Sequence, residues 1–395
     1  MKKFCEWLTI LLFVAVIIAV PVLTIYLPKQ TYSAYENRDL EKLPRYSTKS
    51  LLDGSYMENL ETYYADHFVE RDKLLEGYVA WQLHVLRKPV VNEVTMQGDT
   101  LLPDLGFDEK TNEFYKSSIT NMTESLQKLD QTIKSYGGTF YYVGVPIQQS
   151  VLRDLYPSYM NNAGEFRDYL EHYFFTALQQ RRIRYLDLYP YFSQKVKESD
   201  RYYSKVDHHY TFYGALETYQ QIMNVINQDR ETPLTVLQES DLNFQTIDLP
   251  FYGSRSRKLY NQFQTTEKLT IANPKNPIPF ERIDHGADVP NTVYTLPGKD
   301  DTYVTYDVYM GGDKGETVIQ TNRPELPNVL IFGDSFTNPI ESLLYYSFNE
   351  MHSLDLRIYQ EHTLTQYIES YQPDIVICVR DDTMYINSDG NGHFR

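Results

Sequence analysis

The sequence predicts an α/β fold, with a mostly parallel sheet flanked by helices, on three observations. Short apolar runs typical of buried strands recur along the chain, and segments with helical spacing lie between them. A Gly-Asp-Ser turn directly follows one such run, where α/β folds expose reactive side chains. An apolar segment long enough to span a membrane stands at the N-terminus. The length of 395 residues suits one large domain with an insertion, or two domains.

The first predicted element is a transmembrane helix within residues 1–28. Lys2 and Lys3 precede an apolar run from Trp7 to Leu27. The basic N-terminus favours the cytoplasmic side, so we expect a single-pass protein of the cell membrane with an extracytoplasmic catalytic domain. A cleaved signal peptide is the alternative. We favour an uncleaved signal anchor, because the run is longer than a usual signal core and no small-x-small cleavage site follows before Pro28.

The composition excludes one class of partner and leaves the redox compartment open. The formal net charge is −16, which argues against general affinity for nucleic acid or for anionic lipid surfaces. The two cysteines are Cys5, in the N-terminal segment, and Cys378, in an apolar run, so an internal disulfide is not expected. No cofactor is implied.

A helical region and a catalytic domain are expected to follow the anchor. From Tyr35 to Leu86 apolar residues recur near the helical period, which predicts a helical collar over residues 29–92. The remainder, 93–395, is predicted to alternate strands and helices, with strands at 139–146, 183–188, 329–332 and 374–379 and helices at 164–181, at 212–228 and after Ser335. Residues 231–327 are richer in Pro, Gly, Asn and Thr and are predicted to form a β-rich insertion, with a short strand at 302–306.

Two motifs carry the predicted chemistry. Ser335 of the Gly-Asp-Ser turn is the candidate nucleophile, and a serine hydroxyl needs an imidazole base within hydrogen-bond reach. His209 is the candidate base and Asp207 the residue that orients it, because positions two apart in an extended loop project to one side. His208 then points elsewhere. Together these residues predict a Ser-His-Asp triad for acyl transfer.

Two further features bear on this site. The backbone N–H of Ser335 is a natural oxyanion donor, and the Gly311-Gly312 turn is a candidate for a second, through Gly312. Asp-His-His is also a conceivable metal half-site, since His and carboxylate groups ligate zinc. His352 and His362 would be its further ligands, but their spacing fits no ligand pattern. We favour the triad and predict no metal.

Several segments resemble the DHHW proteins, which are related to the SGNH-hydrolase-like domains of bacterial polysaccharide O-acetyltransferases such as the alginate acetylation proteins. The signature is Asp207-His208-His209-Tyr210. Other segments resembling the family are Glu36-Asn37-Arg38, Asp53-Gly54-Ser55-Tyr56, Asp66-His67-Phe68 through Arg71, Tyr306 through Gly312, and Gly333-Asp334-Ser335. Asp-x-His precedes Gly-Asp-Ser here, as in the acetyltransferase-like branch and opposite to ordinary SGNH esterases.

By this resemblance Ser335, His209 and Asp207 form the triad. The sequence departs from the family pattern at Tyr210, which stands in place of the signature tryptophan. It also lacks a Gly-x-Asn block that would identify an asparagine oxyanion donor. Asn338, Arg380 and Tyr210 therefore join Gly312 as candidates for oxyanion or substrate contacts.

The leading functional hypothesis is O-acetylation of a cell-surface polysaccharide by an acyl-serine mechanism. The resemblance implies two partners, the cell-surface glycan and a multi-spanning membrane acyltransferase that supplies the acyl group. An esterase that deacetylates the same class of polymer is the first alternative, because it differs only in whether water or a sugar hydroxyl resolves the acyl-enzyme. The second alternative is a non-catalytic glycan-binding assembly protein.

Overall fold

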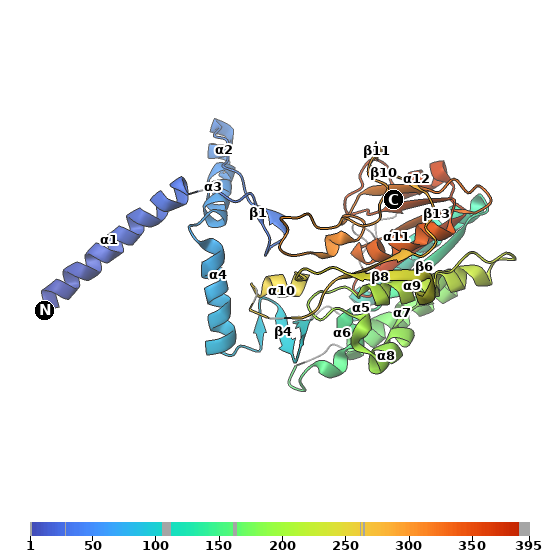
Figure 1. Ribbon diagram of the computed structural model, residues 1–395, viewed down its shortest axis with the longest axis horizontal. Helices are drawn as coiled ribbons and strands as arrows, with labels where there is room; N and C mark the ends of the chain where they lie inside the picture. The colour runs from blue at the N-terminus through green and yellow to red at the C-terminus, as the bar shows by residue number, and fades with distance from the viewer. Residues whose placement is uncertain are drawn as a thin grey trace. The chain divides into compact units, whose positions relative to one another are not determined.

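The computed structural model describes residues 2–27, 29–104, 112–160, 164–260, 262–263 and 265–386. The chain divides into two compact units (Figure 1). The first unit comprises Met1–Thr95 with Ser254–Gln264, and the second comprises Met96–Gly253 with Thr265–Arg395. A short piece of the region predicted as an insertion therefore belongs to the first unit.

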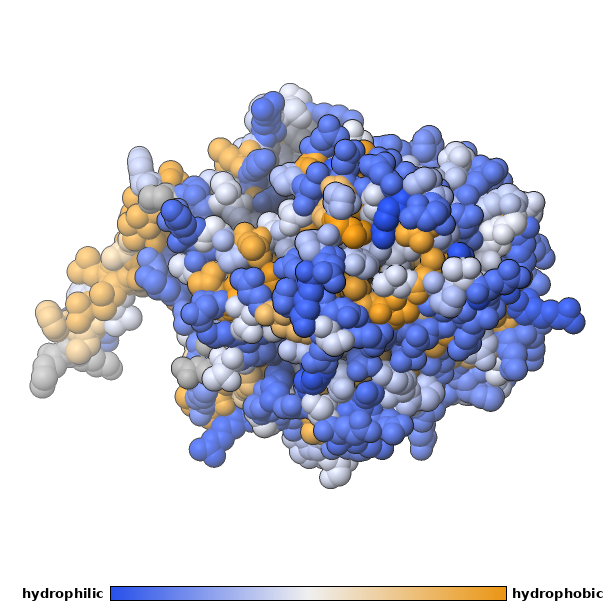
Figure 2. All heavy atoms as spheres, turned by 45° about the vertical axis from the view of Figure 1, so that its right-hand side comes forward, coloured by the Kyte–Doolittle hydropathy of each residue, from blue (hydrophilic) through white to orange (hydrophobic). Residues whose placement is uncertain are grey.

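The first unit begins with the long apolar helix α1, Lys2–Tyr26. Its mean hydropathy reaches 3.0, and its length and composition suit a membrane span. Figure 2 shows orange, hydrophobic residues along it. Either a signal anchor or a signal peptide has these properties. Pro28, the limit of the predicted anchor, lies outside the described residues.

The rest of the first unit is partly helical. Its elements are β1 (Tyr32–Ser33), β2 (Arg38–Asp39), α2 (Thr48–Leu52), α3 (Ser55–Asp66), α4 (Arg71–Ala80), the π-helical turn η1 (Trp81–Val85), β3 (Val90–Val91) and α10 (Ser254–Lys258). β1 and β2 pair antiparallel, and β3 pairs with the start of β4 (Val94–Gln97). The helical pattern predicted from Tyr35 is therefore wrong before Thr48, where a short hairpin and extended chain lead into α2.

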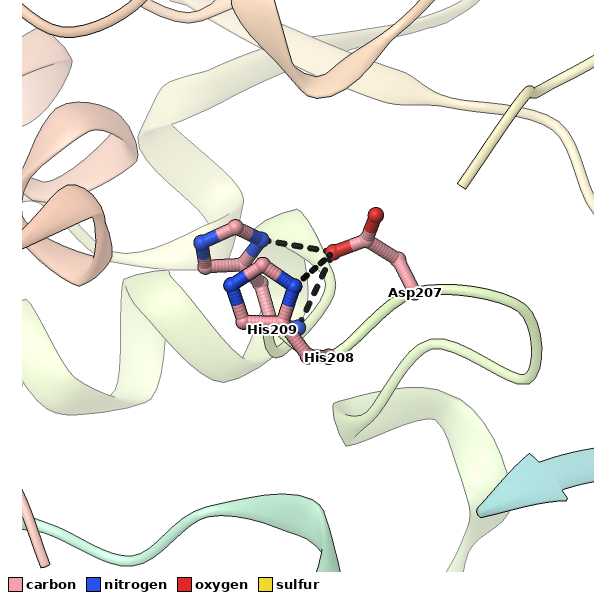
Figure 3. Close-up of side chains that lie close together, drawn as sticks. All are labelled: Asp207, His208 and His209. Carbon is pink, nitrogen blue, oxygen red and sulfur yellow. Dashed lines mark hydrogen bonds and ion pairs between the residues drawn. The ribbon is translucent and has the colours of Figure 1, made fainter. Parts of the chain in front are cut away.

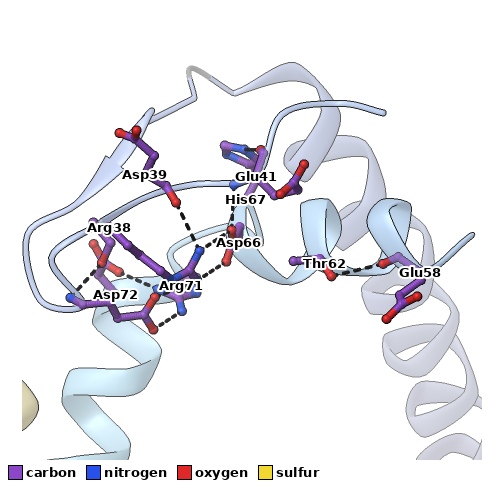
Figure 4. Close-up of polar contacts among 11 residues, drawn as sticks. Arg38, Asp39, Glu41, Glu58, Thr62, Asp66, His67, Arg71 and Asp72 are labelled. Atoms are coloured by element: carbon purple, nitrogen blue, oxygen red, sulfur yellow. Dashed lines mark hydrogen bonds and ion pairs between the residues drawn. The ribbon is translucent and has the colours of Figure 1, made fainter. Parts of the chain in front are cut away.

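An ion-pair network holds this hairpin to the end of α3 (Figure 4). Arg38 Nη1 and Nη2 donate to the two carboxylate oxygens of Asp66 at 2.8 and 2.5 Å. The backbone N–H of Glu41 also donates to Asp66, which lies buried at the end of α3. The Arg38 hydrogen bonds lower the pKa of Asp66 to about 2, so this carboxylate stays ionised. Arg71 extends the network to Glu36 at 2.5 Å.

The second unit is built on an eight-stranded mixed sheet in the order β11-β10-β12-β14-β13-β15-β6-β7. The five strands from β14 to β7 are parallel, and β10, β11 and β12 form an antiparallel edge. The sheet strands are β6 (Thr139–Val145), β7 (Arg184–Asp187), β10 (Glu281–Asp284), β11 (Ala287–Asp288), β12 (Glu316–Gln320), β13 (Asn328–Gly333), β14 (Glu350–Leu354) and β15 (Ile375–Asp381). The predicted mostly parallel α/β sheet is confirmed.

The helices of this unit are α5 (Asn112–Ser135), α6 (Gln148–Val151), α7 (Gly164–Gln180), α8 (Tyr189–Glu198), α9 (Phe212–Gln228), α11 (Asn338–Leu344) and α12 (Leu364–Tyr371). Short 3₁₀ turns are η2 (Arg153–Leu155), η3 (Asp200–Tyr202), η4 (Glu239–Asp241), η5 (Tyr306–Val308), η6 (Ser335–Thr337) and η7 (Tyr345–Ser347). Outside the main sheet lie β5 (Thr100–Pro103) and the antiparallel pair β8 (Leu242–Thr246) and β9 (Thr270–Pro274).

The core explains why the central strands are continuous apolar runs. Apolar residues of α5, α7 and α12 pack with Phe140, Phe332 and Cys378 on one face of the sheet. Ile331 and Ile377, which point to the opposite face, are equally buried. Strands covered on both faces carry apolar residues at every position, not at alternate ones. Parallel strands align their carboxyl ends at one edge, where β13 delivers the Gly-Asp-Ser turn.

The strand predicted at 302–306 is wrong. Val304 makes only an isolated bridge with Phe251, and the chain then enters the 3₁₀ turn η5. The side chain of Thr305 caps this turn by accepting from the backbone N–H of Asp307. Threonine favours strands through its branched side chain but also caps helical turns, and here capping decides the local structure.

Candidate active site

The Asp207-His208-His209-Tyr210 segment lies in the bend between η3 and α9. One oxygen of Asp207, Oδ1, accepts two hydrogen bonds from His209, one from the backbone N–H at 3.0 Å and one from the ring Nδ1–H at 2.6 Å (Figure 3). Asp207 and His209 are therefore brought together as predicted, although through a bend instead of extended chain. Gly214, in the first turn of α9, lets that helix pack closely against this bend, because a Cβ at position 214 would lie 2.6 Å from Cβ of Tyr210.

Ser335 lies at the carboxyl end of β13, at the start of η6. His209 Nε2 is 2.7 Å from Ser335 Oγ. With Nδ1–H donating to the Asp207 carboxylate, Nε2 is the acceptor for the serine proton, and both neighbours fix this tautomer. Asp207 and His209 are 2 % and 4 % exposed, while Ser335 is half-buried. A continuous hydrogen-bonded path thus runs from the buried carboxylate to the serine hydroxyl.

The turn that carries Ser335 is held by its neighbour Asp334. One carboxylate oxygen of Asp334 accepts the N–H of Phe336 at 3.0 Å, and the other accepts the N–H of Asp381 at 3.1 Å. Gly333 is required by the close approach of β15, since a Cβ would clash with the Val379 carbonyl oxygen. Burial raises the pKa of Asp334, and nearby Asp381 adds to that rise.

Aromatic rings enclose the imidazole of His209. Tyr306 stacks on it with ring centroids 3.7 Å apart and planes 6° apart. The His208 ring lies 3.7 Å away at 39°, and Phe336 meets it edge-on at 5.0 Å. The Tyr306 hydroxyl is buried and has no hydrogen-bond partner among the described residues. Burial raises its pKa well above the usual range, so Tyr306 is a neutral phenol. Its ring, not its hydroxyl, therefore contacts the site.

Glu267 supports the loop that leads to Asp207. It accepts the backbone N–H of Lys205 at 2.7 Å, while Ser204 Oγ accepts the N–H groups of Val206 and Asp207. Burial raises the pKa of Glu267 to about 7, with a smaller rise from Asp207. Sequence reasoning missed Glu267 and the stacking role of Tyr306. The Tyr306–Gly312 segment was a recognisable signal, whereas nothing local in the sequence marks Glu267.

The four predicted oxyanion or substrate residues have other roles or lie away from the solvent. The Gly312 N–H donates to the Tyr309 carbonyl at 3.0 Å, so its assignment as an oxyanion donor is wrong in this structure. Tyr210 is buried and its hydroxyl donates to the Phe336 carbonyl, in the turn that carries Ser335. Asn338 Nδ2 donates to Asp313 at 3.0 Å. Arg380 is 1 % exposed, and its guanidinium nitrogens have no hydrogen-bond partner among the described residues.

Ser335 remains the best placed oxyanion donor through its own backbone N–H. It is the first residue of η6, and the first N–H groups of a helical turn lie outside the intrahelical ladder. The arrangement suits attack by Oγ with charge developing beside this N–H.

The same motif holds the only described cluster of three or more potential metal ligands found within 4.8 Å of one another, formed by Asp207, His208 and His209. The 2.6 Å separation of Asp207 Oδ1 from His209 Nδ1 is that of a direct hydrogen bond. Two ligands on one tetrahedral zinc ion would stand about 3.3 Å apart. The geometry observed fits the hydrogen-bonded pair better than a shared ion.

Two protein families match the sequence. Residues 36–144 match the DHHW protein family, and residues 106–278 match the SGNH hydrolase-like domain of acetyltransferase AlgX. No curated protein matches. Among solved structures, Bacillus cereus PatB1 with a sulfonyl adduct has 23% identity and a TM-score of 0.64, covering 76% of this chain and 98% of that one. A DHHW family protein from Eubacterium siraeum has 16% identity and a TM-score of 0.58, covering 77% and 95%.

These structural likenesses establish a shared fold across about three quarters of the chain. The Asp207-His208-His209-Tyr210 segment lies within the AlgX-like match, while Ser335 lies beyond both matches. The chain is thus similar to the DHHW family over residues 36–144 and to the AlgX-like SGNH hydrolase domain over residues 106–278.

Proposed function

We propose that this protein is a membrane-anchored, extracytoplasmic acyl-transfer enzyme that O-acetylates a cell-surface polysaccharide. The observation that carries the proposal is the hydrogen-bonded series Asp207–His209–Ser335, with distances of 2.6 and 2.7 Å. A buried carboxylate, an oriented imidazole and a serine at the mouth of a helical turn make a nucleophile for acyl transfer. The relationship to an acetyltransferase domain supports acetyl as the acyl group.

The mechanism has two half-reactions. His209 Nε2 takes the Ser335 proton while Oγ attacks the carbonyl carbon of an acyl donor, and the Ser335 N–H stabilises the oxyanion. The C–X bond to the leaving group breaks, X receives the proton from His209, and an acyl-serine remains. A sugar hydroxyl then gives its proton to His209, attacks the ester carbonyl and leaves as the acetylated sugar, while Ser335 Oγ recovers the proton.

An aromatic pair beside the catalytic loop supports a glycan acceptor. Tyr252 and Tyr303 stack at 4.5 Å and are half-buried. The Tyr252 N–H donates to the Val304 carbonyl, which holds the two segments together. Gly253, next to Tyr252, packs on the catalytic loop, since a Cβ there would lie 2.9 Å from the Asp207 nitrogen. Rigid aromatic faces offer contact area to the apolar faces of sugar rings at low entropy cost.

Trapping the acyl-enzyme tests the chemistry. The full-length chain in detergent is mixed with an activated acetyl ester, and its intact mass is measured over time. We expect one acetyl group on the wild type and none on Ser335→Ala, with slow or no acylation of His209→Ala. Ser370→Ala, which removes an exposed hydroxyl on α12, should still be acetylated at one site. A folded wild type without adduct or turnover contradicts the proposal.

Adding oligosaccharides separates transfer from hydrolysis. A transferase should pass the label to a sugar hydroxyl faster than to water, whereas acyl-enzyme loss that is independent of the acceptor would identify an esterase. The same experiment with a membrane fraction that contains a multi-spanning acyltransferase tests the proposed donor partner.

A further inference from the structure

The helix formed by α4 and its π turn, residues 71–85, carries an exposed apolar stripe. Leu74, Tyr78, Trp81 and Val85 are 56%, 53%, 47% and 67% exposed. Their spacing of four, three and four residues places them on one face of a helix. On the opposite face of this helix, Val79 and Leu83 are buried. A helix that is apolar on both faces indicates a second contact surface beyond the protein's own core.

The charge of this stripe contrasts with that of the chain. The exposed residues between positions 73 and 85 are Lys73, Leu74, Gly77, Tyr78, Trp81, His84 and Val85. None of them is acidic, in a chain with a formal net charge of −16. Tyr78 and Trp81 also stack on each other, with ring centroids 6.2 Å apart. Trp and Tyr flanked by Lys are the residues enriched where proteins meet the membrane–water interface.

A contact within the first unit places the start of this helix at the end of α1. The backbone N–H of Val69 donates to Thr24 Oγ1 at 3.2 Å, and Thr24 is only 2% exposed. Leu23 of α1 and Leu27, directly after that helix, line one pocket with Phe68 and Val69. α4 begins at Arg71, two residues after the hydrogen bond. If α1 spans the membrane, its last turn is where the chain leaves the hydrocarbon, so α4 starts at that level.

We propose that the Leu74–Val85 stripe binds the lipid interface of the membrane in which α1 is embedded. The occupant is the headgroup and upper acyl region of the bilayer, into which Leu74, Trp81 and Val85 insert, while the exposed ion pair of Lys73 with Glu70 (2.6 Å) stays at the polar headgroup level. The first unit is then attached at two points, the span and the interfacial helix. The inference rests on α1 remaining as an anchor and is independent of the acyl-transfer chemistry.

Tryptophan fluorescence in liposomes tests this directly, because the chain contains only Trp7 and Trp81. A full-length Trp7→Phe chain is reconstituted into phosphatidylcholine liposomes, so that all emission comes from Trp81. Lipid brominated high on the acyl chain should quench at least half of this emission, and aqueous iodide should quench it weakly. The matched control is Trp7→Phe, Trp81→Phe, Tyr159→Trp, in which the new fluorophore occupies a site that is 73% exposed in the second unit.

Two results would overturn the proposal. Quenching by brominated lipid no stronger than in the control, with full access for iodide, means that the stripe meets water. Protection from iodide without quenching by brominated lipid means that protein covers it, for example a second copy of the chain.

A second variant shows whether insertion depends on the stripe. Leu74→Glu with Val85→Glu changes two exposed positions, so folding followed by circular dichroism should be retained. Iodide quenching of Trp81 in liposomes should then rise at least twofold. Leu52→Glu, at an 82% exposed position on α2, should leave it unchanged. Equal effects of the two variants would also contradict the proposal.

Discussion

The phenol ring of Tyr306 lies flat on the imidazole of His209, with centroids 3.7 Å apart and planes 6° apart. In the proposed mechanism this imidazole becomes positively charged twice in each cycle. The negative face of an aromatic ring attracts such a cation, by about 0.5–2 kcal/mol depending on solvation. Tyr306 is thus in position both to hold the ring of His209 and to stabilise its charged form.

Replacing Tyr306 by leucine should lower the rate of acylation by about 2- to 30-fold, which is the rate change that corresponds to losing about 0.5–2 kcal/mol of attraction between the ring and the charged imidazole. Tyr306→Phe should keep near wild-type acylation and equal or higher thermal stability. The reason is that the buried Tyr306 hydroxyl has no partner among the described residues, so removing it loses no hydrogen bond there. Single-turnover acylation and thermal unfolding measure both effects. A Phe variant as slow as the Leu variant would show that the hydroxyl, not the ring, is needed.

Substitutions in the stacked pair of Tyr252 and Tyr303 should affect only the step in which the sugar acceptor takes the acyl group. Each alanine variant should raise the KM for an oligosaccharide acceptor by about 2- to 10-fold, in line with the energy of one aromatic contact. The rate of acylation by a small activated ester should stay within twofold of wild type, because that ester does not reach the pair. The measurement is a comparison of acylation and transfer kinetics on the same preparations. Equal losses in both steps would indicate distortion of the Asp207 loop instead of lost acceptor binding.

Sequence patterns predicted the parts of this fold that depend on local chemistry. β6, β13 and β15 are apolar runs because both faces of the sheet are covered, and α9 forms over the predicted residues 212–228. Asp207, His209 and Ser335 were recognisable as motifs. The structure brings them together because the β13 turn and the α9 bend meet through Tyr210, whose hydroxyl donates to the Phe336 carbonyl.

Contacts between segments that lie far apart in the sequence could not be predicted from these local patterns. The Glu267 side chain accepts a hydrogen bond from the backbone N–H of Lys205, which lies 62 residues earlier in the chain, and no local periodicity marks that pairing. Gly312 was a reasonable oxyanion donor because it lacks a side chain. Backbone N–H groups in a turn often donate within the turn itself, however, and here the Gly312 N–H donates to the Tyr309 carbonyl. The strand predicted at 302–306 failed for a similar reason, since the hydroxyl of Thr305 competes with strand pairing.

The raised pKa of Glu267 makes stability depend on pH. Burial raises this pKa from 4.5 to about 7, so the folded state binds a proton that the unfolded state releases. The stabilisation is complete below pH 4.5 and is lost as the pH rises through 7, by at most about 3 kcal/mol. The thermal midpoint should therefore fall between pH 5.5 and 8.

Two variants isolate this effect. Glu267→Gln imitates the protonated carboxyl and should reduce the decline, leaving the parts due to other carboxyls whose pKa burial raises, namely Glu341 and Asp334 to about 7 and Glu171 to about 8. Glu369→Gln, at an exposed position of α12, should retain the wild-type slope. The thermal midpoint of each variant is measured by differential scanning fluorimetry from pH 5.5 to 8. Parallel curves for wild type and Glu267→Gln would rule out this assignment.

Gly333 joins β13 to the turn that carries Ser335, at a point where the neighbouring strand allows no side chain. A Cβ there would clash with the Val379 carbonyl oxygen of β15 and come within 2.7 Å of Thr337 Cγ2. Gly333→Ala must therefore separate two central strands or displace Ser335 from His209. We expect a loss of about 1–3 kcal/mol in the free energy of unfolding, as for other overpacked cores, and at least a 100-fold slower acylation.

Gly77→Ala is the matched control, because Gly77 lies in α4, has no positive φ, and would offer an added Cβ open space with no atom within 4 Å. That substitution should stabilise the helix by up to about 1 kcal/mol and leave acylation unchanged. Chemical unfolding and single-turnover acylation are measured on both variants. If Gly333→Ala acylates as fast as Gly77→Ala, the turn is looser than the packing of β13 on β15 requires, and the position of Ser335 must be set by Tyr210 and Asp334 alone.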